Sequence, residues 1–129
     1  MTIIQKIIAL KELPGFQVLR QSELIRVAES ACRKDYAPGK TVVAPGAVLS
    51  HLYIVVEGAI CDTASQTRIP RVWGADLLLA NLPTASALTA DLTLGALCLR
   101  LSKRHFFTLI YECPAFLVDL MQSGMSVPK

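Results

Sequence analysis

Hydrophobic residues recur at helical spacing near the start of the chain. The first run ends at Pro14-Gly15, and its apolar members are Ile3, Ile4, Ile7, Ile8 and Leu10. A second amphipathic run extends from Ser22 to about Arg33, with charged residues opposite the apolar ones and Ser22 as a candidate N-cap. The pattern predicts two helices within residues 1–34.

The middle of the chain changes to short β-type runs after Pro38-Gly39. Strands are predicted at 41–43, 52–56 and 59–61, separated by the turn signals Pro45-Gly46 and Glu57-Gly58. A second β-rich stretch runs from Ser86 to Leu101, and the alternation at 92–94 and 97–101 is typical of half-buried strands. Regularly spaced short strands favour a sandwich, roll or barrel over residues 35–101.

Helical spacing returns at the end of the chain. Ser102 is a candidate cap for a helix at 103–112, and Pro114 begins a last short helix that carries Phe116, Leu117, Leu120 and Met121. No linker, repeat or low-complexity segment interrupts the chain. We therefore expect one domain over residues 1–129, mainly β with flanking helices, in which 102–122 form the C-terminal helices.

Composition narrows the class of protein. The chain has 129 residues, of which 53% are apolar and only 18% charged, and its mean hydropathy is +0.47. Such a composition favours an apolar surface shared with a partner. Charged and turn residues interrupt every apolar run, so no membrane insertion is expected.

The distribution of charge and the spacing of the cysteines argue against a nucleic-acid partner and against secretion. The net charge of +3 comes from scattered basic residues, which do not form the basic stripe of a nucleic-acid-binding protein. The four cysteines contain no C-x-x-C pair, and no secretory signal begins the chain. We expect buried free thiols and a cytoplasmic location.

The β-type segments carry a resemblance to a known family. Residues 39–43, Pro45-Gly46 and the run from Leu52 to Gly58 resemble the opening of cyclic-nucleotide-binding domains, the sensor domains of catabolite-activator type. The segments from Leu13 to Leu24 and from Leu101 to Pro114 are similar to the helical flanks of that family. The resemblance implies a double-stranded β-helix, or jelly roll, and a cytoplasmic signalling role of bacterial type.

The family's phosphate-binding cassette is altered in this sequence. In the family a Gly-Glu pair begins the cassette, and a later Arg pairs with the cyclic phosphate. If Gly74 takes the place of the glycine, then Ala75 replaces the glutamate and Thr84 replaces the arginine. If Gly74-Ala75-Asp76 instead matches the preceding turn, Ala80 replaces the glutamate. In both alignments the two residues that anchor the ligand in the family, the glutamate and the arginine, are missing.

The resemblance implies a degenerate ligand site with six members: Gly74, Ala75, Asp76, Thr84, Ala85 and Ser86. Without the arginine we expect weak or no binding of cyclic AMP or cyclic GMP, and no other cofactor. Asp76 is expected to cap the cassette helix. The alternative function is a sensor that holds a cyclic nucleotide or another small ligand through Gly74, Thr84 and Ser86.

Two apolar groups are candidate contacts for a protein partner or a second copy of the chain: Leu77, Leu78, Leu79 and Leu82 in the cassette, and the last helix with Phe116 and Leu120. Core packing is the competing explanation for the cassette leucines. Trp73 is interpreted as a cover for the open end of the roll, with an interface as the alternative.

Signals for catalysis are missing from the sequence. Only His51 and His105 are present, which is too few for a metal site of cupin type, and no G-x-S-x-G motif occurs. Few residues follow Pro114, so a helix-turn-helix unit with direct contact to DNA is not expected. We expect a regulatory module that is not an enzyme and binds no metal.

Overall fold

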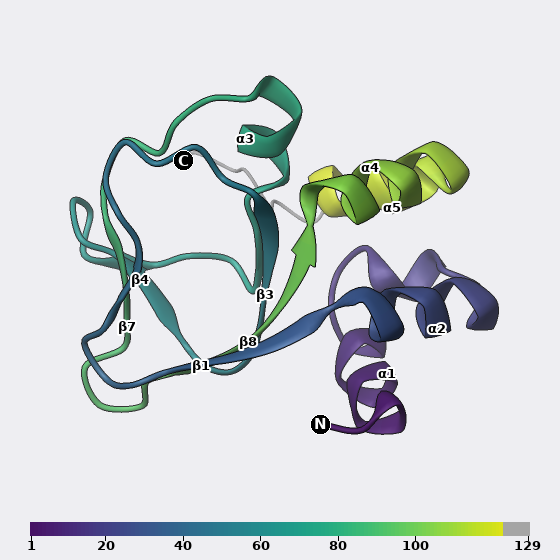
Figure 1. Ribbon diagram of the computed structural model, residues 1–129, viewed down its shortest axis with the longest axis horizontal. Helices are drawn as coiled ribbons and strands as arrows, with labels where there is room; N and C mark the ends of the chain where they lie inside the picture. The colour runs from purple at the N-terminus through teal and green to yellow at the C-terminus, as the bar shows by residue number, and fades with distance from the viewer. Residues whose placement is uncertain (123–129) are drawn as a thin grey trace.

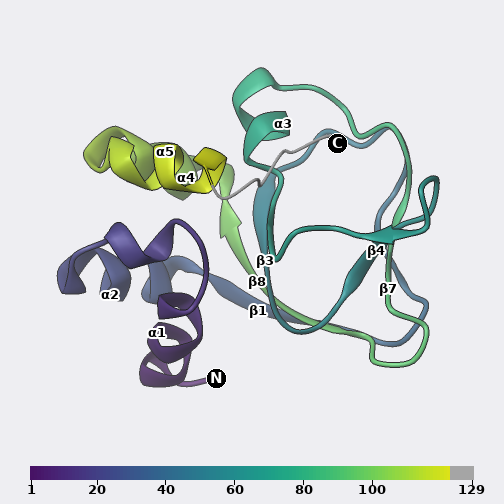
Figure 2. The same ribbon diagram turned by 180° about the vertical axis from the view of Figure 1, so that it is seen from behind.

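The computed structural model describes residues 1–122 and contains two antiparallel sheets with helices outside the first of them (Figures 1 and 2). The helices are α1 (Ile3–Lys11), the short 3-10 helix η1 (Phe16–Val18), α2 (Gln21–Ser30), α3 (Ala75–Ala80), α4 (Lys103–Glu112) and α5 (Pro114–Gln122). The strands are β1 (Cys32–Tyr36), β2 (Thr41–Val43), β3 (His51–Gly58), β4 (Ile60–Asp62), β5 (Thr67–Arg68), β6 (Val72–Trp73), β7 (Leu88–Ala90) and β8 (Ala96–Ser102).

The strands form a roll of two four-stranded sheets. The first sheet has the order β1-β8-β3-β6 and the second has the order β2-β7-β4-β5. In Figure 1 the first sheet stands between the helices on the right and the second sheet on the left. The prediction of a mainly β roll with flanking helices is confirmed.

The two faces of the first sheet have different neighbours. Leu52 pairs with Leu101 and Ile54 with Leu99, so these four side chains share one face of the pleated sheet. All four are at most 1% exposed, and Leu101 lines a groove together with residues of α2 and α4. The helices therefore cover this face. The opposite face, with Tyr53, Val55 and Cys98, is turned away from them.

The second helix begins and ends earlier than its pattern predicts. Arg20, and not Ser22, is its N-cap, and the Arg20 N–H donates to the carboxylate of Glu23. The helix ends at Ser30, and the strand β1 starts at Cys32, within the range predicted as helix. Every residue of β1 pairs with β8. That pairing supplies main-chain hydrogen bonds which outweigh the local helical preference.

Residues 92–94 form a turn and not the half-buried strand that their alternation predicts. The Asp91 carboxylate accepts hydrogen bonds from the main-chain N–H groups of Thr93 and Leu94, at 3.0 and 2.9 Å. Leu92 is 83% exposed and Leu94 is 61% exposed. The carboxylate satisfies the turn locally, so no strand partner is needed.

The last helix is fastened to the N-terminal segment. The Gly15 N–H donates to the Asp119 carboxylate at 2.6 Å, and the rings of Phe16 and Phe116 meet edge to face at 4.9 Å. Gly15 has φ +88°, and a Cβ there would lie 2.7 Å from Leu120 Cδ2. The predicted starts of α4 and α5, capped by Ser102 and opened by Pro114, are confirmed.

Among residues 1–122, no helix has the length and apolar character needed to cross a bilayer.

Candidate functional site

The cassette consists of α3 and the segment that leads from it to β7, at one end of the roll (Figure 1, top). Gly74 precedes the helix with φ +109°, and a Cβ at this position would come within 2.9 Å of Leu49 Cδ1. Glycine is therefore required for both conformation and space. The helix begins at Ala75, as in the alignment that puts Ala75 in the place of the family's glutamate.

Ala75 leaves no room for an acidic side chain. The residue is 0% exposed and belongs to the continuous core of the domain. A carboxylate placed here would lose its hydration without gaining a partner. Asp76, the next residue, is exposed, and its carboxylate accepts from the Leu77 N–H at 2.9 Å. Asp76 is therefore placed to stabilise the first turn of α3, while Gly74 is the N-cap.

Thr84, which the sequence resemblance aligns with the family's arginine, is hydrogen-bonded to the loop after β2. Its N–H donates to the Ala47 carbonyl at 2.9 Å, and its own carbonyl accepts from the Gly46 N–H at 2.9 Å. Its hydroxyl donates to the Ala44 carbonyl at 3.1 Å, and the residue is only 5% exposed. Thr84 thus fills its position and joins the cassette to the opposite loop.

Ser86 is likewise engaged within the protein. Its hydroxyl donates to Asp62 Oδ1 at 2.7 Å, while the same carboxylate accepts from the Ala64 N–H. These hydrogen bonds, that of Ser86 foremost, lower the pKa of Asp62 below its usual value. An ionised carboxylate beside Ser86 repels a phosphate group. Ala85, between the two hydroxyl residues, is exposed.

The arginines nearest to the cassette in sequence have other partners. Arg71 donates to the carbonyls of Val55 and Val56, at 3.2 and 2.6 Å, and Arg68 lies 3.7 Å from the Asp91 carboxylate. Both line a hollow of about 330 Å³ beside the β3–β4 turn. The structure shows neither arginine in the place of the missing one.

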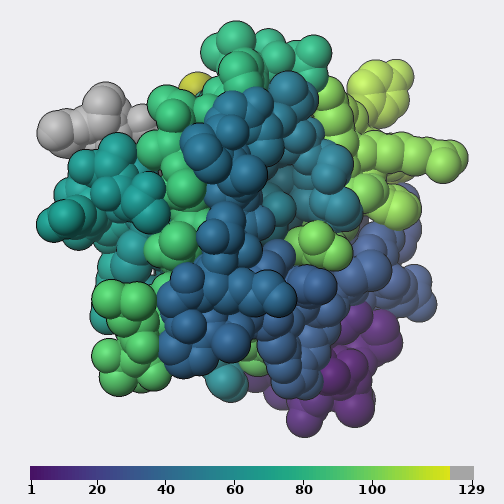
Figure 3. Space-filling model, turned by 60° about the vertical axis from the view of Figure 1, so that its left-hand side comes forward, coloured from purple at the N-terminus to yellow at the C-terminus, as the bar shows by residue number. Residues whose placement is uncertain are grey.

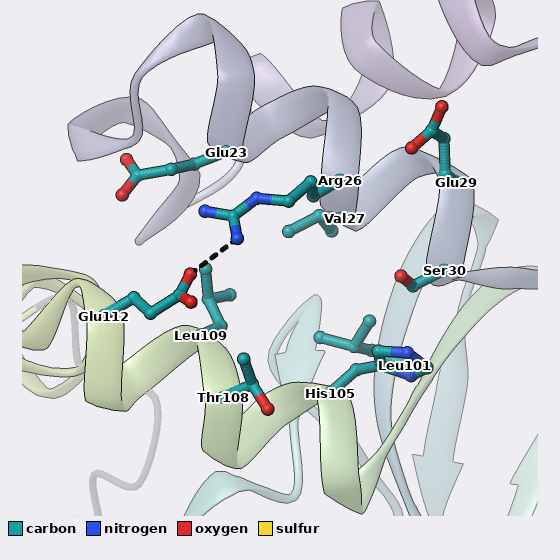
Figure 4. Close-up of a pocket in the computed structure, with 10 residues that line it drawn as sticks. All are labelled: Glu23, Arg26, Val27, Glu29, Ser30, Leu101, His105, Thr108, Leu109 and Glu112. Atoms are coloured by element: carbon teal, nitrogen blue, oxygen red, sulfur yellow. Dashed lines mark ion pairs between the residues drawn. The ribbon is translucent and has the colours of Figure 1, made fainter.

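Hollows of several hundred cubic ångströms occur away from the cassette. Four of them, of about 310 to 410 Å³, are lined by described residues, and none of the four includes a residue between 72 and 88. A groove of about 310 Å³ lies between α2 and α4, where Arg26 reaches Glu112 at 2.7 Å beside Val27 and Leu109 (Figure 4). The amphipathic patterns of both helices indicate that they pack, but no signal in them reveals this groove.

The candidate contact residues divide between core and surface. Leu78 is 1% exposed and Phe116 and Leu120 are 0% exposed, so the expectation that these three contact a partner is corrected: they pack inside the domain. Leu77 is half-buried, whereas Leu79 is 42% and Leu82 is 53% exposed. Val48, which is 57% exposed, pairs through its main chain with Pro83 beside them. We call Val48, Leu79 and Leu82 the cassette patch.

Each of the two histidines lies beside a serine hydroxyl. His51 lies 2.8 Å from the Ser50 hydroxyl and His105 lies 2.7 Å from the Ser102 hydroxyl, on different elements. Within residues 1–122, no three His, Cys, Asp or Glu side chains come together as a metal site. Trp73 is half-buried, with its ring 6.3 Å from that of Tyr53.

The cysteines are free thiols in different environments, and not all are buried as expected. Cys32 is exposed, Cys61 and Cys113 are half-buried, and Cys98 is buried. Burial raises the pKa of the Cys98 thiol to about 12. Because the thiolate is the reactive form, Cys98 is chemically inert at neutral pH.

Comparison with solved structures places this architecture among known folds. No protein-family model and no curated protein matches the sequence. The regulatory subunit of a cAMP-independent protein kinase A from Trypanosoma brucei superposes with a TM-score of 0.75 and 17% identity, over 97% of this chain and 48% of that one. The regulatory domain of Toxoplasma gondii protein kinase A, crystallised with cAMP, gives 0.69 and 20%, over 83% and 44%.

A bacterial protein has a similar fold. The catabolite activator protein of Thermus thermophilus superposes with a TM-score of 0.65 and 18% identity, over 84% of this chain and 55% of that one. The chain thus spans about half the length of these three proteins. The antiparallel roll with flanking helices agrees with the fold that the sequence resemblance implies. The chain has the fold of the cyclic-nucleotide-binding domains.

Proposed function

We propose that this chain is a regulatory module that binds cyclic nucleotides weakly or not at all and acts through protein contacts in the cytoplasm. The observation that carries the proposal is the state of the two anchor positions. Ala75 and Thr84 are buried, and the hydroxyl and both main-chain groups of Thr84 are bonded within the protein. The cassette is thus packed against the core and the loop after β2, and its residues 74–87 include no cation that could pair with a phosphate.

The cost of the missing arginine supports weak binding. A hydrogen bond to a charged group contributes about 1.5 to 3 kcal/mol, which corresponds to roughly a tenfold to hundredfold loss of affinity. The Asp62 carboxylate beside Ser86 adds repulsion to that loss. The missing arginine and the Asp62 carboxylate therefore both weaken binding of the phosphate of a cyclic nucleotide.

The structural neighbours show that this fold occurs in both kinds of regulator. The trypanosome protein is described as the regulatory subunit of a cAMP-independent kinase, whereas the Toxoplasma domain was crystallised with cAMP. The packed cassette favours the first kind for this chain. A sensor that holds another small ligand through Thr84 and Ser86 is less well supported, because both hydroxyls already donate within the protein.

The cassette patch is the surface through which such a module would act. Leu79 on α3, Leu82 just after α3 and Val48 in the loop between β2 and β3 are exposed apolar side chains. An apolar partner surface would remove them from water. Regulation would then depend on contact with the patch and not on a bound nucleotide.

Calorimetric titration of the full chain with cyclic AMP and with cyclic GMP tests the first part of the proposal. We expect no binding at micromolar concentrations of either nucleotide. Saturable binding with a micromolar dissociation constant would overturn it.

Variants of two exposed leucines test the second part. We expect Leu82→Glu to abolish capture of the regulated protein and Leu92→Glu, at a more exposed leucine in the β7–β8 turn, to leave it unchanged. Equal capture by both variants would show that the cassette patch is not the contact.

A further inference from the structure

The first helix presents isoleucines to solvent on a well-formed turn. Ile4 is 69% and Ile8 is 58% exposed, and they lie four residues apart on one side of α1. A capping box fixes the start of this helix, with Gln5 N–H donating to the Thr2 hydroxyl oxygen and Thr2 N–H donating to the Gln5 side chain. In the space-filling view α1 (purple) reaches the surface beside the blue β1 region (Figure 3).

A hollow of about 410 Å³, lined by Ile8 of α1, lies against strands β1, β8 and β3 of the first sheet. Its apolar lining includes Ile8, Ala9, Val56 and Leu97. The same face of the molecule therefore carries projecting apolar side chains and an apolar recess. We call this surface, with Ile4 beside it, the α1 face.

The charged groups on the α1 face have opposite signs. Arg33 and Glu57 both line the hollow. Arg33 donates to Asp35 at 2.9 and 3.0 Å, and both residues are well exposed. Glu57 is exposed and takes part in none of the side-chain hydrogen bonds or ion pairs found among residues 1–122. One cation and one unpaired carboxylate thus stand at the same recess.

We propose that the α1 face binds a second copy of this chain through a two-fold symmetric contact. In such a contact the same surface appears on both partners, so it must be complementary to itself. A surface with both a projection and a recess, and with one charge of each sign, meets that condition. A partner of uniformly acidic or basic character would meet repulsion at either Arg33 or Glu57.

The geometry of the pairing follows from the symmetry. Ile4 and Ile8 of each copy enter the recess of the other, against Leu97 and Val56. Glu57 of each copy then approaches Arg33 of the partner subunit, whose guanidinium keeps donors that Asp35 does not use. The isoleucines are removed from water, which is the main driving force for association.

This proposal does not depend on the proposed function. The α1 face and the cassette patch contain different residues, on different elements. Failure of one would leave the other unaffected, and the variants below separate them.

Sedimentation equilibrium of the full chain over a range of concentrations tests the pairing. We expect a reversible dimer. Its dissociation constant should rise at least tenfold in the single variant Ile8→Glu and at least tenfold in the single variant Ile4→Glu, at a more exposed position. The matched control is Leu82→Glu, the same type of change in the cassette patch, which should leave the dimer unchanged. A monomer at all concentrations, or a dimer that neither isoleucine variant weakens, would overturn the proposal.

Charge reversal tests the two-fold register directly. We expect Glu57→Arg and Arg33→Glu each to weaken the dimer severalfold, and the double variant to recover most of the loss, because each copy then presents the exchanged pair. Circular dichroism would confirm that every variant is folded. A double variant that associates as weakly as the weaker single one would refute the Glu57–Arg33 contact between subunits.

Discussion

The Thr84 hydroxyl donates a hydrogen bond to the Ala44 carbonyl, 3.1 Å away, and so connects the cassette to the loop after β2. Replacement by valine keeps the shape of the side chain and removes this donor. The Ala47 N–H still reaches the same carbonyl, so we expect Thr84→Val to lower the free energy of unfolding by about 1 kcal/mol. Urea unfolding measures the change.

The matched control for that variant is Thr108→Val. The Thr108 hydroxyl also donates to a main-chain carbonyl, that of Arg104, but on the exposed side of α4. Water replaces a lost donor there, so this change should cost less than Thr84→Val. An equal cost for both would show that the link across the roll adds no stability.

Restoring the family's arginine tests whether the cassette is merely lacking a charge. We expect Thr84→Arg to lower the free energy of unfolding by about 2 kcal/mol or more, because a guanidinium enters a site that is 5% exposed and has no carboxylate partner. The variant should not gain cyclic-nucleotide binding in calorimetry. A stable variant that binds cyclic AMP would instead show that the pocket is open apart from one residue.

Two glycines with similar backbone angles separate conformational strain from steric contact. Gly15 has φ +88° and Gly46 has φ +78°, but a Cβ at Gly15 meets Leu120 at 2.7 Å whereas a Cβ at Gly46 meets nothing within 4 Å. We expect Gly46→Ala to cost about 1 kcal/mol through the left-handed backbone alone. Gly15→Ala should lower the free energy of unfolding by at least about 1 kcal/mol more than Gly46→Ala does, because its Cβ overpacks against α5.

Thermal unfolding of both alanine variants, with Tm converted to free energy at a common temperature, gives the comparison. Equal losses would mean that α5 moves aside without cost. That outcome would contradict the tight fastening of α5 to the N-terminal segment.

The Asp62 carboxylate predicts a pH dependence of stability. Its pKa is lowered in the folded state, first by the hydrogen bond from Ser86, so the folded protein binds a proton there less readily than the unfolded chain does. The stabilisation is fully present above the unfolded pKa, near 3.9, and is lost as the pH falls through the folded pKa.

Acid unfolding of Ser86→Ala checks this assignment. Without the serine hydroxyl the folded pKa of Asp62 moves back toward its usual value, so the loss of stability below about pH 4 should be shallower than in the wild type. Identical acid profiles for the two proteins would exclude Asp62 as the group responsible.

Periodicity was sufficient to predict much of the architecture. Apolar spacing located α1, α4 and α5, and the glycine and proline turns located β2 and β3, because these elements are determined by local preferences together with burial of one face. It failed at β1, where four of the five residues are charged or aromatic and the strand exists through its pairing with β8. Long-range pairing leaves little trace in a local window.

The cassette shows a similar division. The prediction that the cassette lacks both anchors needs only residue identity and the family resemblance, with Ala75 or Ala80 aligned with the glutamate and Thr84 with the arginine. The use that the fold makes of Thr84, and the core positions of Leu78, Phe116 and Leu120, could not, because they depend on which segments meet in three dimensions. Helical spacing places a leucine on a face without saying what covers that face.

The pairing of β1 with β8 also has a consequence for biosynthesis. β1 emerges early from the ribosome, yet the strand that supplies its hydrogen bonds in the sheet is the last one to be translated. The first sheet therefore cannot close until most of the chain is available, and β1 stays unpaired meanwhile. A nascent chain with open strand edges and a high apolar content is prone to aggregate, so production of this protein should depend on chaperones and on the rate of translation.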